Sequence, residues 1–365
     1  MKIVGIDIDR VQVNHRGDWF FVHVRTDEGL SGLGELNPQA TQTGSLEKLL
    51  ELSNSLIGRD PTQIERLVAD TLRQSSDCAT VHALSAVEPA LWDLVGKWLN
   101  TPVYQLLGGA CHEEMRLYAN INRATTDRTP AGFARNAAAA VTDGFDAVKL
   151  APFDGMPFRI DRAGDAQPGI ECMQAVREAI GPKIDLLIDC HSHFTPRGAL
   201  EVADALRDLN LYWFEEPVPD EDIDGYRVIK ERCGMTVAGG ETRRLIKGFW
   251  EMLDASVVDV IMPDITMVGG LSELKKVSAL AEAHGILASP HGPFGPVMLA
   301  ASLQSVITHP GFLIMEYAWG EVPWRHDLVL PAETILKGRM VLSDRPGLGI
   351  RLNPDVVCRH RVSIT

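Results

Sequence analysis

Three acidic residues stand at equal intervals along the chain, each at the end of a short apolar segment. These are Asp189, Glu215 and Glu241, spaced 26 residues apart. Three carboxylates at one edge of a fold repel one another unless a cation lies between them, and hard oxygen ligands of this kind suit Mg²⁺. A single acid at a strand end is often only a helix cap, but three in successive units are stronger evidence. We therefore predict a magnesium site formed by these residues.

The next apolar segments lead into residues suited to proton transfer. Asp264 follows one segment and His291 follows the next. A carboxylate on an adjacent strand orients an imidazole and raises its basicity, so we predict that His291 is a general base held by Asp264. Glu316 ends the following segment and is predicted to hydrogen-bond a developing enolate oxygen or to hold a substrate hydroxyl. The alternative for Glu316 is a salt bridge with an arginine at the same edge, such as Arg325.

A second histidine lies close to the first acid of the predicted metal site. His191 follows Asp189 by two positions, and side chains at this spacing on a strand share a face, whereas Cys190 between them points to the other face. We therefore expect His191 to reach the same cavity, where it would donate a proton to a departing hydroxyl. His193 repeats the spacing, but it is expected to lie in the loop.

These residues all follow short apolar strands that alternate with amphipathic helices. The predicted strands span 117–121, 146–150, 184–189, 211–215, 236–240, 257–261, 286–289 and 312–316, each followed by a helix candidate. Eight such units are the number in a (β/α)8, TIM-like barrel, whose active site lies where the strands end. A doubly wound sheet is the alternative, but it rarely has eight nearly equal repeats.

The two ends of the chain lack this alternation. The first part has a β-like pattern over residues 2–34 and helical periodicity over 45–57 and 81–99, which predicts an α+β capping domain over residues 1–112. The barrel is then expected over residues 113–337. The segment 338–365 is predicted to leave the barrel and pack back on the capping domain.

Composition excludes several classes of protein. The 365 residues are 45% hydrophobic and 23% charged, which is ordinary for a globular protein and excludes a mainly disordered chain. The net charge of −14 leaves no excess of Lys and Arg to neutralise phosphates, so no nucleic-acid partner is expected. No apolar run approaches the ~20 residues of a membrane helix. No signal-peptide pattern is present and the six cysteines are scattered, so reduced thiols in the cytoplasm are expected.

The motifs together resemble the enolase superfamily and, within it, the mandelate racemase group. The resemblance rests on Asp189, Phe214-Glu215-Glu216-Pro217, Gly239-Gly240-Glu241, Pro263-Asp264 with Gly269-Gly270, Pro290-His291 and Glu316. The segments 90–97 and 106–109 are also similar to the capping domain of that group. The resemblance implies a Mg²⁺ cofactor, a base that forms a metal-stabilised enediolate, and an even-numbered homo-oligomer.

One position departs from the racemases of this group. They typically carry Lys-x-Lys at the end of the second strand, whereas this chain has Lys149-Leu150-Ala151, and an alanine cannot move a proton. This pattern, with a histidine two positions after Asp189, resembles galactonate dehydratase and related sugar-acid dehydratases. The resemblance implies that Lys149 lies near the substrate carboxylate; the alternative is a strand lysine paired with a neighbouring acid.

The same resemblance assigns the steps of a dehydration. His291 takes the proton from C2, Asp264 orients His291, and His191 protonates the leaving C3 hydroxyl, which gives a 2-keto-3-deoxy acid from an aldonic or aldaric acid. Substrate contacts are expected from Trp19 in the polar segment 14–20 and from Arg325 at the end of the segment 319–325.

Two other functions remain open from the sequence. The first is a racemase, epimerase or cycloisomerase of a hydroxy acid on the same fold. The second is a non-catalytic regulatory protein that binds a sugar acid, against which the intact metal and dyad positions argue.

Overall fold

The N-terminal strands form an antiparallel sheet. The computed structural model describes residues 1–364, apart from the side chains of residues 40 and 41. The strands β1 (Ile3–Asn14), β2 (Gly17–Thr26) and β3 (Ser31–Leu36) pair in chain order. At the turn between β1 and β2, Gly17 has a φ of +132°, which residues with a side chain rarely adopt.

The capping helices pack on this sheet. They are α1 (Ala40–Thr43), α2 (Ser45–Leu56), α3 (Ile64–Gln74), α4 (Cys78–Trp98) and α5 (Val103–Leu106). The long helix α4 lies directly against β3, because Gly32 and Gly34 leave room for it. A Cβ at Gly32 would lie 1.8 Å from the carbonyl oxygen of Ala90, and one at Gly34 would lie 2.0 Å from that of Ala86.

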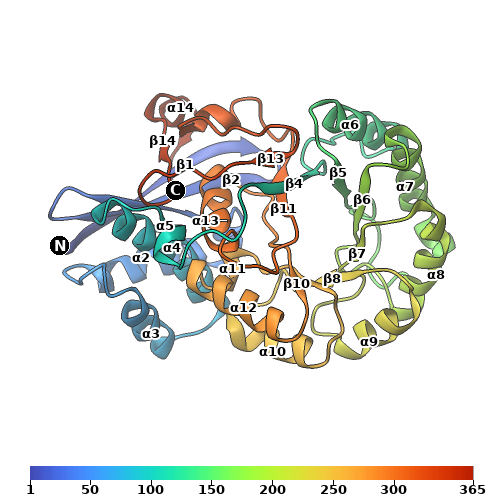
Figure 1. Cartoon of the computed structure of the whole chain (residues 1–365), viewed down its shortest axis with the longest axis horizontal. Helices are drawn as coiled ribbons and strands as arrows, with labels where there is room; N and C mark the ends of the chain where they lie inside the picture. Colours follow the sequence, from blue (N-terminus) through green and yellow to red (C-terminus); the bar gives the residue numbers. More distant parts are fainter. Residues whose placement is uncertain (365) are drawn as a thin grey trace.

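The following residues form the predicted barrel. In the described chain its eight parallel strands are β4 (Met115–Asn120), β5 (Ala147–Leu150), β6 (Asp185–Asp189), β7 (Trp213–Glu215), β8 (Val237–Gly239), β9 (Val260–Ile261), β10 (Leu287–Ala288) and β11 (Met315–Ala318). Each strand from β4 to β9 pairs with the next in chain order, and β11 pairs with β4. A parallel bridge between Ala288 and Phe312 closes the ring. Figure 1 shows the labelled strands of the barrel arranged in this ring. The predicted fold class is therefore confirmed.

Helices surround the ring of strands. They are α6 (Pro130–Thr142), α7 (Gln167–Ile180), α8 (Pro196–Leu206), α9 (Ile223–Arg232), α10 (Leu245–Asp254), α11 (Ile265–Val268), α12 (Leu271–Ala283) and α13 (Pro296–Val306), with short 3-10 turns at Ala163–Ala166 and Arg207–Leu209. The eighth unit differs from the prediction, because only a 3-10 turn, Arg325–Leu328, follows β11. The eighth strand spans Met315–Ala318 and so ends two residues beyond Glu316. The residues before it, 312–314, lie against β10, where they close the ring.

The C-terminal segment joins both parts of the molecule. β13 (Arg339–Met340) pairs antiparallel with β4 of the barrel, whereas β12 (Val329–Leu330) pairs with β14 (Arg351–Leu352). After α14 (Pro354–His360), β15 (Arg361–Val362) pairs antiparallel with β1 and completes the sheet of the cap. The divisions at residues 112 and 337 stay predictions.

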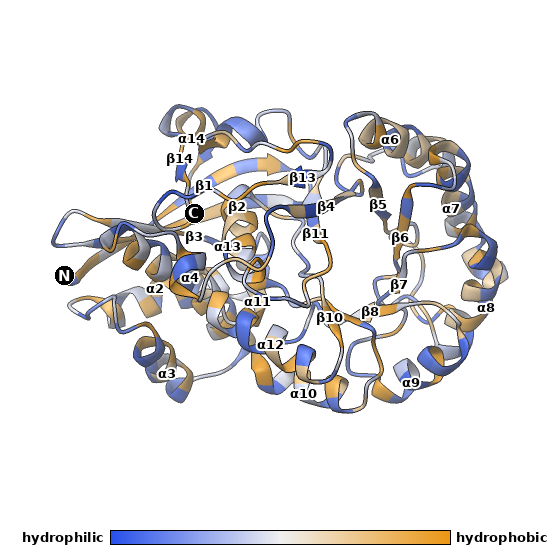
Figure 2. Ribbon diagram, in the orientation of Figure 1, coloured by the Kyte–Doolittle hydropathy of each residue, from blue (hydrophilic) through white to orange (hydrophobic). Residues whose placement is uncertain are grey.

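Apolar side chains fill the bottom of the barrel. A cluster inside the ring contains Tyr118, Leu187, Trp213, Met262 and Ile314, all buried. In Figure 2, β8 and β10 are coloured as hydrophobic, whereas the helices around the ring carry both hydrophobic and hydrophilic residues. The interior of the barrel is thus packed with apolar side chains, and the polar side chains of the site lie at the C-terminal ends of the strands. Within residues 1–364, no helix combines the length and the apolar character needed to cross a bilayer.

Candidate active site

The three predicted metal ligands meet at the C-terminal ends of three adjacent strands. Asp189 ends β6 and Glu215 ends β7, where the two residues are direct partners in the sheet register. Glu241 follows β8 by two positions. One carboxylate oxygen from each residue lies within 4.8 Å of the others. The Oε2 atom of Glu241 is buried and accepts no hydrogen bond from any described residue. Three converging carboxylates with one unpaired oxygen fit a hard divalent cation such as Mg²⁺.

Burial and mutual repulsion affect the protonation of these acids. Burial, together with the nearby carboxylates, raises the pKa of Glu215 to about 8, although Lys149 opposes the shift. The pKa of Glu241 is also raised, chiefly by burial. The pKa of Asp189 is lowered in spite of its burial, because the cations of His191 and Lys149 favour its charged form. A metal ion at this site therefore has to displace a proton.

Lys149 of β5 is buried among the acids. Its Nζ atom lies 2.7 Å from Glu215 Oε1, 2.8 Å from Glu316 Oε1 and 3.6 Å from Asp189 Oδ2. Although burial opposes its charge, Glu215 and Glu316 raise the pKa of Lys149 well above its ordinary value. The pairing of Lys149 with neighbouring acids is thus present in the structure, and its contact with a substrate carboxylate stays a prediction.

Glu316 of β11 is held from several sides. Besides Lys149, it accepts hydrogen bonds from Asn120 Nδ2 and from the backbone N–H of Gly292, both at 2.7 Å. The cation beside Glu316 is therefore Lys149 and not Arg325, which was the alternative considered from the sequence. The predicted contact of Glu316 with an enolate oxygen or a substrate hydroxyl stays a prediction. Because Gly292 follows His291, Glu316 also fixes the loop that carries the predicted base.

His291 and Asp264 form the predicted dyad. The Nδ1 atom of His291 lies 2.7 Å from Asp264 Oδ2, and its Nε2 atom lies 3.5 Å from Glu241 Oε2 and 3.8 Å from Glu316 Oε2. Asp264 is fixed in turn, because its Oδ1 atom accepts the backbone N–H of Thr266 at 2.7 Å. Burial opposes protonation, yet Glu241 and Glu316 raise the pKa of His291 to about 10. The free ring nitrogen therefore points at the cluster of carboxylates.

His191 contacts the same cluster from another strand. Its Nε2 atom lies 2.9 Å from Asp189 Oδ2, and its Nδ1 atom lies 2.5 Å from Asp154 Oδ1. The backbone at His191 has a φ of +41°, a left-handed conformation that turns the chain sharply after β6. Burial is outweighed by Asp189 and Asp154, so the pKa of His191 is raised well above its ordinary value. His193 lies in the loop, where its ring stacks on Phe158.

The two histidines occupy opposite sides of the barrel mouth. His191 follows β6 and His291 follows β10. In the closed ring, β7, β8 and β9 separate these strands on one side, and β5, β4 and β11 on the other. The carboxylate cluster lies between the two imidazole rings, because His191 contacts Asp189 and His291 contacts Glu241.

Trp19 and Arg325 lie in a separate buried group between the cap and the barrel. The ring of Trp19 is 1% exposed and packs edge-on against Trp324, with Arg325 over it. The guanidinium of Arg325 pairs with Glu333 at 3.0 Å. Arg325 also donates to the carbonyl oxygen of Phe294, whose ring packs against His291. The structure does not bring these two residues into the carboxylate cluster, and their contact with substrate stays a prediction.

Two supporting acids lie in loops, several residues beyond the strand ends from which the site was predicted. Asp154 follows β5 by four positions and binds His191, as given above. Asp220 follows β7 and accepts the N–H of Gly240 at 2.9 Å and the hydroxyl of Thr242 at 2.7 Å, which fixes the turn of Glu241. Their sequence signal is only an acid within a few residues of a predicted strand end.

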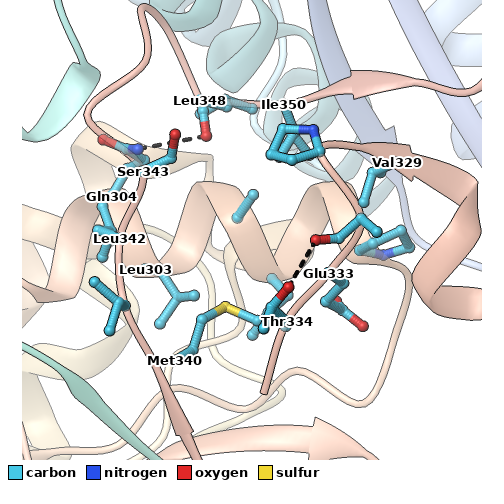
Figure 3. A pocket seen from close by; sticks show the side chains of 16 residues that line it. Leu303, Gln304, Val329, Glu333, Thr334, Met340, Leu342, Ser343, Leu348 and Ile350 are labelled. Carbon is cyan, nitrogen blue, oxygen red and sulfur yellow. Dashed lines mark hydrogen bonds between the residues drawn. The ribbon is translucent and has the colours of Figure 1, made fainter. Parts of the chain in front are cut away.

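A pocket at the other edge of the barrel is distinct from this site. It lies between α13 and the segment 329–350, with Leu303, Met340 and Leu348 among its lining (Figure 3). None of the predicted site residues lines it. The candidate active site is therefore the mouth of the barrel, under the cap.

The chain is similar to known proteins over nearly its whole length. Residues 10–108 match the family described as mandelate racemase / muconate lactonizing enzyme, N-terminal domain, and residues 132–356 match the enolase C-terminal domain-like family. The D-xylonate dehydratase of Haloferax volcanii is 31% identical and covers 98% of this chain and 88% of its own. The D-galactarolactone cycloisomerase of Agrobacterium fabrum is 33% identical over 93% of this chain and 90% of its own.

A solved structure has the same arrangement of cap and barrel. The crystal structure of a mandelate racemase/muconate lactonizing enzyme from Jannaschia sp. CCS1 superposes with a TM-score of 0.88 at 29% identity. The match covers 100% of this chain and 99% of that one.

Proposed function

The chain is an enzyme that belongs to the mandelate racemase/muconate lactonizing enzyme family of the enolase superfamily, and from this premise we propose that it dehydrates sugar acids with Mg²⁺. The substrate is an aldonic or aldaric acid, and the product is a 2-keto-3-deoxy acid. The observation that carries the proposal is the placement of His191 and His291 on opposite sides of one carboxylate cluster.

Asp189, Glu215 and Glu241 would hold the metal ion. When bound, Mg²⁺ supplies positive charge beside the substrate carboxylate, which offsets the charge of an enediolate. Lys149 adds a fixed cation from below, where it already neutralises Glu215 and Glu316. This arrangement lowers the cost of removing a proton next to a carboxylate.

His291 removes the proton from C2 in its neutral form, which a cation held by Glu241 would favour, because the charge of Glu241 is the main cause of the raised pKa of His291. Its Nε2 atom faces the cluster, and Asp264 holds the Nδ1–H so that Nε2 is the accepting nitrogen. Glu316 lies beside the same nitrogen at 3.8 Å, where its carboxylate stabilises the imidazolium that forms. The dyad therefore both accepts the proton and holds the resulting charge.

His191 completes the elimination. As the C3–O bond breaks, the imidazolium of His191 donates a proton to the departing hydroxyl, which leaves as water. Asp154 and Asp189 keep this ring protonated before the reaction, since both favour its charged form. The enol that remains takes up a proton and becomes the 2-keto-3-deoxy acid.

The second candidate is a cycloisomerase or epimerase. The similarity to a D-galactarolactone cycloisomerase supports it, because that enzyme has a related chain at comparable identity. Ala151 argues against a racemase with two bases, because it stands at the position of the second lysine. A non-catalytic sugar-acid-binding role is disfavoured by the intact cluster and dyad.

The test is to incubate the purified protein and Mg²⁺ with a library of aldonic and aldaric acids. We expect a 2-keto-3-deoxy acid, detected as its semicarbazone, from at least one of them. Formation of an epimer or lactone isomer alone, or solvent exchange at C2 without loss of water, would contradict the dehydratase assignment and favour the second candidate.

A further inference from the structure

A pocket rich in cationic side chains opens beside His191. Arg16, from the turn between β1 and β2, and Arg128, from the loop between β4 and α6, line it together with Asp154, Phe158 and His193. One arginine comes from the cap and the other from the barrel, so the pocket exists only where the two parts meet. Side chains from four separate loops thus converge at this point.

The positive charge of this pocket exceeds its negative charge. Asp154 lies 3.2 Å from Nη2 of Arg16 and 3.1 Å from Nη2 of Arg128, so it contacts one nitrogen of each guanidinium. The same carboxylate also holds His191. The other lining side chains offer no second carboxylate. Two arginines therefore share one anion, and a planar guanidinium with free N–H groups is suited to binding a further carboxylate.

Arg128 has an additional unsatisfied group. Its Nη1 atom is buried and has no hydrogen-bond partner among the described residues. Its Nη2 atom donates to the carbonyl oxygen of Ala151, and its guanidinium lies over the ring of Phe133. A buried donor without an acceptor is costly, and a small movement toward an anion in the pocket would satisfy it.

The position of the pocket relates it to one end of the substrate. The proposed function places the substrate carboxylate at the metal ligands, C2 at His291 and the C3 hydroxyl at His191. His191 itself lines the pocket, on the side of the ring opposite His291. The carbon chain beyond C3 therefore continues from His191 toward Arg16 and Arg128.

We propose that Arg16 and Arg128 bind a negatively charged group at the far end of the substrate, which makes the preferred substrate an aldaric acid with a second terminal carboxylate. This inference rests on the proposed function, because the direction of the substrate follows from it. A phosphate on the terminal hydroxyl of an aldonic acid is the other source of such a charge.

The experiment compares matched substrates that differ only at the terminal carbon. We measure kcat/KM with Mg²⁺ for glucarate against gluconate, for galactarate against galactonate, and for 6-phosphogluconate. The wild-type enzyme should prefer the diacid by roughly tenfold to a hundredfold, the value of a charge-assisted hydrogen bond. Arg16→Gln should lower kcat/KM for the diacid more than for the monoacid, so the preference falls. Arg135→Gln, a change at an exposed arginine outside the pocket, is the matched control.

The outcomes separate the inference from the proposed function. Dehydration of the monoacids as fast as the diacids would overturn the inference and leave the dehydratase assignment standing. A clear preference for 6-phosphogluconate would overturn the choice of carboxylate. If no acid yields a 2-keto-3-deoxy product, the proposed function fails. The preference for a diacid is then tested by calorimetry, and it is overturned if glucarate binds no more tightly than gluconate. Arg128→Lys is the second variant, because it keeps the charge but not the planar group. It should also reduce the preference for the diacid.

Discussion

Lys149 and Glu215 form a buried ion pair in the barrel interior, with Nζ 2.7 Å from Oε1. The carboxylate that we expect to bind the metal is therefore shared with a cation built into the chain. Without Lys149, Glu215 and Glu316 would lose the ammonium group that lies 2.7 and 2.8 Å from them, and Asp189 would lose a second cation besides His191.

This pair predicts that stability depends on Mg²⁺ when the lysine is removed. Lys149→Met should lower the free energy of unfolding by ~3–5 kcal/mol in EDTA, because it leaves buried carboxylates unpaired. Added Mg²⁺ should restore a large part of the loss. Urea unfolding with and without Mg²⁺ measures both effects, with Lys183→Met at an exposed position as the control. An equal loss in both conditions would show that the metal does not bind beside Lys149.

Metal binding is expected to release protons. Burial raises the pKa of Glu215 although Lys149 opposes the shift, so a proton competes with the metal for this carboxylate. Because the metal needs the carboxylate, Mg²⁺ affinity should rise as the pH increases from 6 to 8. Calorimetric titration in two buffers of different ionisation enthalpy counts the protons released. Asp189→Asn should abolish binding, and EDTA should abolish activity. Full activity after complete chelation would refute the three-carboxylate metal site.

The two histidines should separate the steps of the reaction. We expect His191→Asn to lose dehydration by about 10²-fold or more while the C2 proton still exchanges with solvent deuterium, because the base is intact. His291→Asn should lose both exchange and dehydration. Proton NMR in D₂O follows the exchange, and the semicarbazone assay follows the product. Retained dehydration in His191→Asn would remove His191 from the role of the acid.

Glu35 of the cap predicts a pH dependence of stability. Its two oxygens accept the N–H groups of Gly295 and Met298 at 2.7 and 2.9 Å, at the start of α13. Burial raises the pKa of Glu35 to about 7 from its ordinary value of 4.5. Between these values the folded state keeps a proton that the unfolded state loses. The free energy of unfolding should therefore fall by up to ~3 kcal/mol from pH 4.5 to 7 through this group.

The comparison of Glu35→Gln with wild type isolates this contribution. The variant has no titrating group at this position, so the difference in unfolding free energy between the two proteins should change with pH over that interval. Urea unfolding at pH 5 and at pH 7.5 measures it. A difference that is the same at both values would mean that Glu35 is ionised throughout.

The strand-end acids were predictable from sequence because parallel strands bring their C-terminal ends to one rim. Spacing alone therefore placed Asp189, Glu215 and Glu241 together, and the same argument paired Asp264 with His291. The eight strands were predictable because short apolar segments alternate with amphipathic helices along the chain.

The remaining features depend on contacts that no local pattern encodes. Asp154 lies in a loop and meets His191 only through the fold, and Glu35 belongs to the cap but caps a barrel helix. Lys149 fits either of two expectations until its neighbours are known. The segment after β11 is a similar case, because Trp324 stacks on His360, a contact between distant positions that no local pattern encodes.

The pairing of β15 with β1 brings residues from opposite ends of the chain into one sheet. During synthesis, β1 emerges long before residues 361–362, so its outer edge lacks this partner strand until they are made. The barrel strands β4 to β10 pair with sequence neighbours and can assemble progressively, whereas the cap sheet lacks its fourth strand until β15 is made. The exposed edge of β1 is therefore the place where a nascent chain most needs protection from pairing with a second copy.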